Sequence, residues 1–191
     1  MIDFCLKGIR IRLHFGFFAV IAIMLSSGSI MAEEVLICCA LHECGHFAAM
    51  RLCGVKIIAF DAYGGGMKIT ADPPIGYLSL GRELFILLAG CGVNLISSLV
   101  FGGLLKMNTY ALISLSLCVF NLLPCAAFDG GQAIKAIAVK LCVPQTVFFI
   151  EKLQFYCGAA FTLIAILAML TEGRFNITLP LTMLLILWES R

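Results

Sequence analysis

Long uncharged stretches constrain the fold of this chain more than any other feature of its sequence. Residues 13–32, 84–105 and 107–128 contain no Asp, Glu, Lys or Arg. Each stretch is as long as the roughly 20 residues that an apolar α-helix needs to cross a bilayer. Hydrophobic residues make up 62% of the chain, against roughly 45–50% in soluble domains. The chain is therefore predicted to be an integral membrane protein.

The predicted fold is an all-α polytopic membrane protein, built as a single membrane-embedded domain over residues 1–191. Its apolar stretches divide it into about six transmembrane helices. These are residues 13–32, 35–50, 80–105, 107–128, 145–170 and 175–188. The last is the shortest and contains Pro180, so it is the weakest candidate for a full span. Lys135 and Lys140 mark a short amphipathic helix between the fourth and fifth spans.

Residues 56–70, after the second helix, have a different character. Apolar β-branched and aromatic residues lie on either side of Gly64-Gly65-Gly66. This pattern predicts a short β-hairpin, with a flexible loop as the alternative interpretation.

The positive charges predict how this layout is oriented. With the N-terminus inside, 11 of the 13 Lys and Arg residues lie on the cytoplasmic side, and only Lys106 and Arg174 lie outside. If the last segment does not span, Arg191 joins them. The chain is thus expected in the cell membrane, surrounded by the lipid bilayer, with its N-terminus in the cytoplasm. The net charge of +2 is too small to indicate a nucleic-acid partner.

One motif within residues 35–50 carries candidate chemistry, His42-Glu43-Cys44-Gly45-His46. On a helix, two histidines four residues apart lie on one face and can hold one metal ion. The glutamate can reach a water beside that ion. Imidazoles and a carboxylate are costly in an apolar helix unless they have a function.

The ten cysteines do not indicate a disulfide framework, because most lie within apolar stretches and act as small hydrophobic residues. Cys39 shares the helical face of His42 and is a weaker candidate ligand. Cys44 is not a ligand, because it lies about 200° around the helix from His42.

A catalytic zinc site usually has three protein ligands, so the histidine pair needs a third. Asp129 and His14 both lie at predicted cytoplasmic helix ends. Asp129 is favoured, because a carboxylate suits zinc and two glycines follow it, which is unusual for a surface charge. The structural alternative for Asp129 is the N-cap of the following helix.

Three motifs, in their order along the chain, resemble the site-2 protease family of intramembrane zinc metalloproteases. They are His42-Glu43-Cys44-Gly45-His46, Gly90-Cys91-Gly92-Val93-Asn94, and Asn121-Leu122-Leu123-Pro124 followed by Asp129-Gly130-Gly131. The resemblance implies one zinc ion per chain, held by His42, His46 and Asp129, with Glu43 as the catalytic acid and base. It also implies cleavage of membrane-anchored or membrane-associated proteins within or next to a transmembrane segment.

The chain is most similar to the compact subgroup that includes the stage IV sporulation protease, which processes a membrane-associated pro-sigma factor. No segment is long or polar enough for the PDZ domain of some members, and the chain ends before the CBS domain of others. The resemblance implies regulated proteolysis of a transcription-regulator precursor in a bacterial membrane, with the site opening to the cytoplasm and a regulatory membrane partner. Residues 125–128 depart from the family pattern, beside the third ligand.

Several details of the reaction follow as expectations. Asn121 is the first candidate to stabilise the oxyanion, and Asn94 is the second. The polar face around Ser97 and Ser98 is expected to line a path for water. The edge of the predicted hairpin is expected to pair with an unwound substrate strand.

Two other functions remain open. A membrane metal-ion transporter or sensor would use buried histidines and acids, but it does not require a glutamate directly after His42. An inactive family member acting as a scaffold would not need Glu43, both histidines and Asp129 to be intact.

Overall fold

The computed structural model describes residues 1–6, 8–26, 28–64, 66–141 and 144–172. The chain divides into two compact units, Met1–Asn121 and Leu122–Arg191. Most described residues are helical, and the first unit also contains a four-stranded sheet. The single-domain layout over residues 1–191 stays a prediction, and the predicted segment 175–188 lies outside the described residues.

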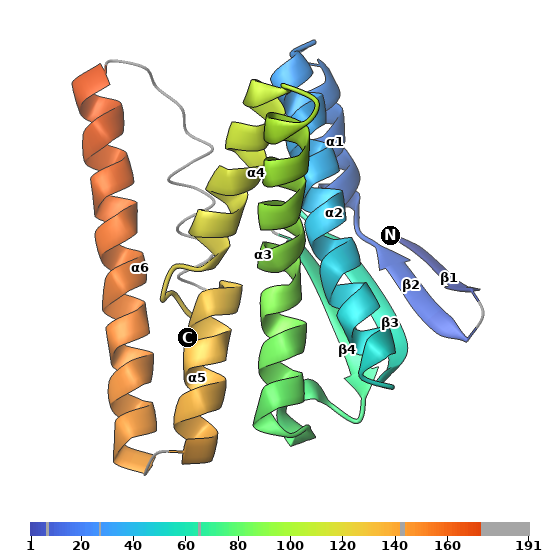
Figure 1. Ribbon diagram of the computed structural model, residues 1–191, viewed down its shortest axis with the longest axis vertical. Helices are drawn as coiled ribbons and strands as arrows, with labels where there is room; N and C mark the ends of the chain where they lie inside the picture. The colour runs from blue at the N-terminus through green and yellow to red at the C-terminus, as the bar shows by residue number, and fades with distance from the viewer. Residues whose placement is uncertain (7, 27, 65, 142–143, 173–191) are drawn as a thin grey trace. The chain divides into compact units, whose positions relative to one another are not determined.

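Three helices of the first unit pack side by side (Figure 1). They are α2 (Ile30–Leu52), α3 (Leu80–Gly103) and α4 (Asn108–Asn121). Three helical segments in the described part of the chain are long and apolar enough to cross a membrane, namely α2, α3 and Pro144–Ile164 of α6 (Pro144–Glu172). The chain is thus a mostly helical membrane protein, while the layout of about six spans is not confirmed.

The prediction of one span over residues 13–32 is wrong. Leu13 ends a β-strand, α1 covers only Phe15–Ser26, and α2 begins at Ile30. The Ser26 hydroxyl donates a hydrogen bond to the Ile23 carbonyl (2.9 Å), and Gly28 has a positive φ of 59°. A serine that binds its own helix backbone and a left-handed glycine both favour a chain reversal over a continuous helix.

The predicted span over residues 107–128 is also too long, because α4 ends at Asn121. The two residues after it lead into Pro124, which cannot continue a helix. The amphipathic helix marked by Lys135 and Lys140 is confirmed as α5 (Asp129–Leu141). Lys135 forms an ion pair with Glu151 of α6 (2.7 Å).

The sheet has the order β1-β2-β3-β4. Its strands are β1 (Ile2–Leu6), β2 (Ile9–Leu13), β3 (Lys56–Tyr63) and β4 (Gly66–Asp72). The antiparallel pairing of β3 with β4 confirms the predicted hairpin. β2 runs parallel to β3, with α1 and α2 as the crossover between them. The two N-terminal strands were not predicted, so the fold is helical with a small sheet rather than all-α with one hairpin.

Arginines near the N-terminus hold this sheet together. Arg12 on β2 lies opposite Asp61 on β3 and forms an ion pair with it. Arg10 binds Asp3 of β1 through Nη2 (2.6 Å). That hydrogen bond from Arg10 holds the pKa of the Asp3 carboxyl below its usual range. These positive charges therefore form cross-strand ion pairs, besides contributing to the predicted orientation.

The hairpin anchors the C-terminal end of α2. The hydrophobic cluster at this point consists of residues of α2, the hairpin and α3, together with the residue just before β3: Ala49, Met50, Val55, Ile57, Ala71 and Ile86. α2 ends at Leu52, and Gly54 follows with a φ of 71°, a left-handed conformation that glycine commonly adopts after a helix. The last turns of α2 are therefore fixed against both β3 and α3.

Candidate metal centre

The motif histidines lie together on one face of α2. His42 and His46 are both buried, with 7% and 9% of their surface exposed. Their rings are 4.8 Å apart between centroids, and their Nε2 atoms are 3.1 Å apart. One helical turn thus brings two imidazole nitrogens within reach of a single ion.

Helix α3 orients the second of these rings. The Nδ1 atom of His46 lies 2.8 Å from the carbonyl oxygen of Ile86. A carbonyl oxygen can only accept a hydrogen bond, so Nδ1 of His46 carries the ring proton and is the donor. The Nε2 atom of His46 therefore presents its lone pair toward His42, which is the usual arrangement of a metal-binding histidine.

Glycines allow α2 and α3 to approach closely at this level. A Cβ atom on Gly45 would lie 2.8 Å from the carbonyl oxygen of Ala89. A Cβ atom on Gly90 would lie 2.5 Å from Nε2 of His46 and 2.7 Å from Nε2 of His42. Gly45 therefore serves the close packing of α2 on α3, and Gly90 provides the space in which the two rings lie.

Asn94 lies against the first histidine. It is completely buried on α3, and its Nδ2 atom is 3.3 Å from Nδ1 of His42. Its Oδ1 atom is buried without a hydrogen-bond partner in the described part of the chain. The sequence placed Asn94 second to Asn121 as an oxyanion donor, whereas its contact in the structure is with a predicted metal ligand.

The geometry of the two histidines fits zinc. Nitrogen ligands at 2.0–2.1 Å in a tetrahedral site lie roughly 3.3 Å from each other. The observed Nε2 separation is 3.1 Å. The Gly90 surface leaves both rings unobstructed, and the His46 tautomer is the one that zinc requires.

The remaining candidate residues near the motif differ in their exposure. Glu43 is half-buried beside His42, and Cys44 is exposed. Cys39 is half-buried one turn before His42. His14 is half-buried directly after β2, and its backbone N–H donates to the Ala62 carbonyl (2.8 Å).

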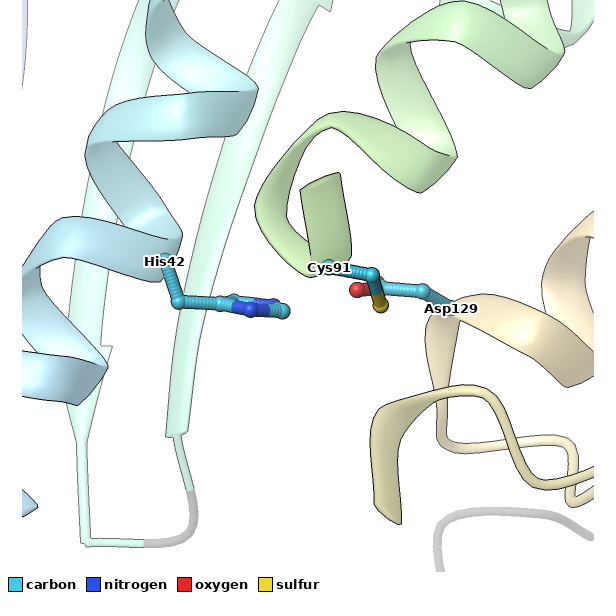
Figure 2. A group of neighbouring side chains, drawn as sticks. All are labelled: His42, Cys91 and Asp129. Carbon is cyan, nitrogen blue, oxygen red and sulfur yellow. The ribbon is translucent and has the colours of Figure 1, made fainter. Parts of the chain in front are cut away.

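Cys91 is a residue of this site that the sequence interpretation missed. Its Sγ atom lies within 4.8 Å of a ring nitrogen of His42. Figure 2 shows the His42 ring extending from α2 and the Cys91 side chain from α3, drawn with Asp129, the first residue of α5. The available signal was that Cys91 lies one residue after Gly90 and three before Asn94, a spacing that keeps all three near one face of a helix.

Within the second unit, close backbone packing holds the helix end at which Asp129 lies. Cβ atoms on Gly130 and Gly131 would collide with the carbonyl oxygens of Leu122 and Cys125. The side chain of Gln154 donates to the Gly131 carbonyl (2.7 Å). Asp129 itself is half-buried at the first position of α5. The glycines after it therefore serve packing and hold this carboxylate at a defined helix end.

Three polar residues have different surroundings from those expected. Ser97 and Ser98 were expected to line a water path, but their hydroxyls bind Ser114 (2.7 Å) and the carbonyl of Ala111 (2.8 Å) on α4. The Asn121 amide donates to the Leu117 carbonyl of its own helix (3.0 Å). These serines thus join α3 to α4 in the structure.

Comparisons with known proteins agree with this chemistry. The chain is 29% identical over 153 residues to a zinc metalloprotease of Methanocaldococcus jannaschii. That match covers 72% of this chain and 45% of the relative, so the chain spans less than half of the relative's length. The fold is similar to that of a site-2 protease from the same organism, with a TM-score of 0.69 and 25% identity over 99% of this chain and 93% of that one. No family model matches the sequence.

Proposed function

This chain is related to the site-2 protease family of zinc metalloproteases, and on that premise we propose that it is an intramembrane zinc metalloendopeptidase. Its substrates are membrane-anchored or membrane-associated proteins, cut within or next to a transmembrane segment. The observation that carries the proposal is the buried histidine pair on α2, whose Nε2 atoms lie 3.1 Å apart.

The proposed ligands of one zinc ion per chain are His42, His46 and Asp129. The fixed Nδ1–H tautomer of His46 supports this set, because it frees Nε2 for the ion. The packed start of α5 supports Asp129, because a ligand must be held in place by its surroundings. When bound, zinc supplies a Lewis acid that polarises the peptide carbonyl and makes water a stronger acid.

Glu43 is the proposed acid and base. Its carboxylate accepts the proton of the attacking water and then transfers it to the departing amine. Its half-buried position directly after His42 supports this role. Asn121 remains the proposed oxyanion donor. To act, its amide must leave the Leu117 carbonyl and turn toward the substrate.

The sheet supports a proposed route for the substrate. A transmembrane helix must unwind before its backbone can be cut. β3 is paired on one side with β2 and on the other with β4. β4 is therefore an edge strand of the sheet, and its unpaired side can take an added strand. Regulated cleavage of a transcription-regulator precursor, as in sporulation, is the finer proposal. It includes a regulatory membrane partner and a site open to the cytoplasm of a bacterium.

The decisive experiment replaces Glu43 with Gln in the full-length chain. Cleavage fragments of membrane proteins are quantified in cells that make either form, and zinc is measured in both purified proteins. We expect cleavage to fall by at least about 100-fold, which is within the usual contribution of a general base. Bound zinc should stay at one ion per chain.

Glu33→Gln is the matched control, because Glu33 is exposed in the first turn of the same helix. It should leave cleavage unchanged. If Glu43→Gln cleaves as well as the wild type, the proposed mechanism is wrong. Equal metal transport by both forms, without cleavage, would instead favour the transporter.

A further inference from the structure

The hydrogen bonds around the two histidines form a series in which the donor and the acceptor of each bond can be assigned. The Nδ1–H group of His46 donates a hydrogen bond to the Ile86 carbonyl, so the Nε2 atom of His46 can only accept a hydrogen bond. The Nε2 atom of His42, 3.1 Å away, must then be the donor to it when no ion lies between them. A neutral imidazole carries one proton, so Nδ1 of His42 is an acceptor. The Nδ2 atom of Asn94 is the donor that faces it.

A bound zinc ion would reverse the direction of one hydrogen bond in this series. Zinc between the two Nε2 atoms requires a lone pair from each, so the proton of His42 must move to Nδ1. The residue facing Nδ1 must then accept a hydrogen bond. The side chain of Asn94 has such an acceptor in Oδ1, which is buried and lacks a partner in the described part of the chain. Turning the amide by 180° exchanges Nδ2 for Oδ1 at almost the same position.

We propose that Asn94 is a positioning residue for the metal site, whose amide turns over when zinc binds. In the metal-free protein it donates to Nδ1 of His42 and stabilises the pair in its hydrogen-bonded form. In the zinc-bound protein it accepts from Nδ1–H and fixes the ring as a ligand. The inference depends on the proposed zinc site, but it concerns this residue of α3 and no step of the reaction.

The surroundings of Asn94 hold its backbone while leaving its amide able to turn. The hydroxyl oxygens of Ser97 and Ser114 lie 3.1 Å and 2.9 Å from the Asn94 carbonyl oxygen and 2.7 Å from each other. Each hydroxyl has one proton, so one donates to the carbonyl and the other donates either to the carbonyl or to the first hydroxyl. This turn of α3 is thereby fixed to α4, so the distance from Asn94 to His42 does not depend on the orientation of the amide.

Two substitutions separate this role from simple packing. Asn94→Leu keeps a similar volume and removes the acceptor, so zinc affinity should fall about 10–100-fold, as for other partners of ligating histidines. Asn94→Asp keeps an acceptor facing Nδ1, so zinc should bind at least as tightly as in the wild type. A packing role predicts the reverse order, because leucine suits a buried apolar site and a carboxylate does not.

Zinc affinity is measured by competition with a chromogenic chelator on the purified, full-length protein. Ser98→Ala is the control, because it removes a part-buried α3–α4 hydrogen bond that does not involve Asn94. It should leave zinc affinity unchanged. Equal affinity in the wild type and Asn94→Leu would overturn the inference, and so would equal losses in both Asn94 variants. A wild-type protein that binds no zinc would instead refute the proposed function.

A second measurement needs no substitution. The chain has only three histidines, so ¹⁵N-histidine NMR can assign each tautomer. The His42 proton should be on Nε2 without zinc and on Nδ1 with zinc, while the His46 proton stays on Nδ1. A His42 proton on Nδ1 in both states would exclude the turning of the amide.

Discussion

Gly90 offers a sharp test of the metal centre, because it is replaced without touching any proposed ligand. In Gly90→Ala the new methyl group would lie 2.5 Å from Nε2 of His46 and 2.7 Å from Nε2 of His42. Ordinary carbon contacts begin near 3.4 Å, so the rings must retreat by as much as about 0.9 Å. Ligands must be held within about 0.5 Å of their working positions. The substitution should therefore impair zinc binding directly.

The magnitude follows from two opposing terms. Overpacking in a well-filled site costs about 1–3 kcal/mol. Alanine stabilises the helix by about 0.5–1 kcal/mol relative to glycine, because it is the better helix former. The free energy of unfolding should therefore fall only modestly, by up to about 2.5 kcal/mol, and the protein should still fold. Zinc affinity should fall about 10–100-fold, because the displaced atoms are the ligands themselves.

Gly92→Ala is the matched control for this experiment. Gly92 lies on the same helix two residues later, and a Cβ atom there has no neighbour within 4 Å in the described structure. It gains the same helix propensity without the collision. Both variants are compared with the wild type in thermal unfolding and in chelator competition for zinc. If Gly90→Ala binds zinc as tightly as Gly92→Ala, the rings do not lie over Gly90 in the functional protein.

Two further changes test the second unit and the sheet. Gly131→Ala would collide with the Cys125 carbonyl, so it should displace Asp129 and lower proteolysis at least tenfold while the histidine pair stays intact; unchanged proteolysis would refute that packing role. Proline at each position of β4 from Met67 to Thr70 in turn removes one backbone donor. At least one should slow cleavage several-fold if the substrate pairs with this edge, and normal cleavage in all four would exclude strand addition.

Much of this molecule could be predicted from local patterns. The spacing of His42 and His46 fixes their common helical face, and the structure has both rings on that face. The hairpin and the end of α2 also follow from local residues, such as the glycines at positions 54 and 64–66. Each of these features depends on neighbours in sequence, so no tertiary information was needed.

The sheet was underestimated because its other half depends on distant contacts. Residues 2–13 combine apolar residues with Lys7, Arg10 and Arg12, a composition that is also typical of the flank of a membrane helix. The pairing of β2 with β3, in which Arg12 lies opposite Asp61 and forms an ion pair with it, makes β2 a strand of this sheet. Likewise, Ser26 and Gly28 were counted within an apolar stretch, although their backbone preferences end the helix there.

The metal centre likewise contains residues that sequence patterns reveal and residues that only tertiary contacts reveal. Ligand types and spacings can be recognised in sequence, because the chemistry of zinc restricts them to a few residues. The residues that orient these ligands are not restricted so narrowly. A backbone carbonyl at Ile86, a missing side chain at Gly90 and an amide at Asn94 act through their position alone. All three come from α3, so the close packing of α2 on α3 converts two histidines on a helix into a pair with defined protons. The pairing of these helices should therefore be as essential for zinc binding as the histidines themselves.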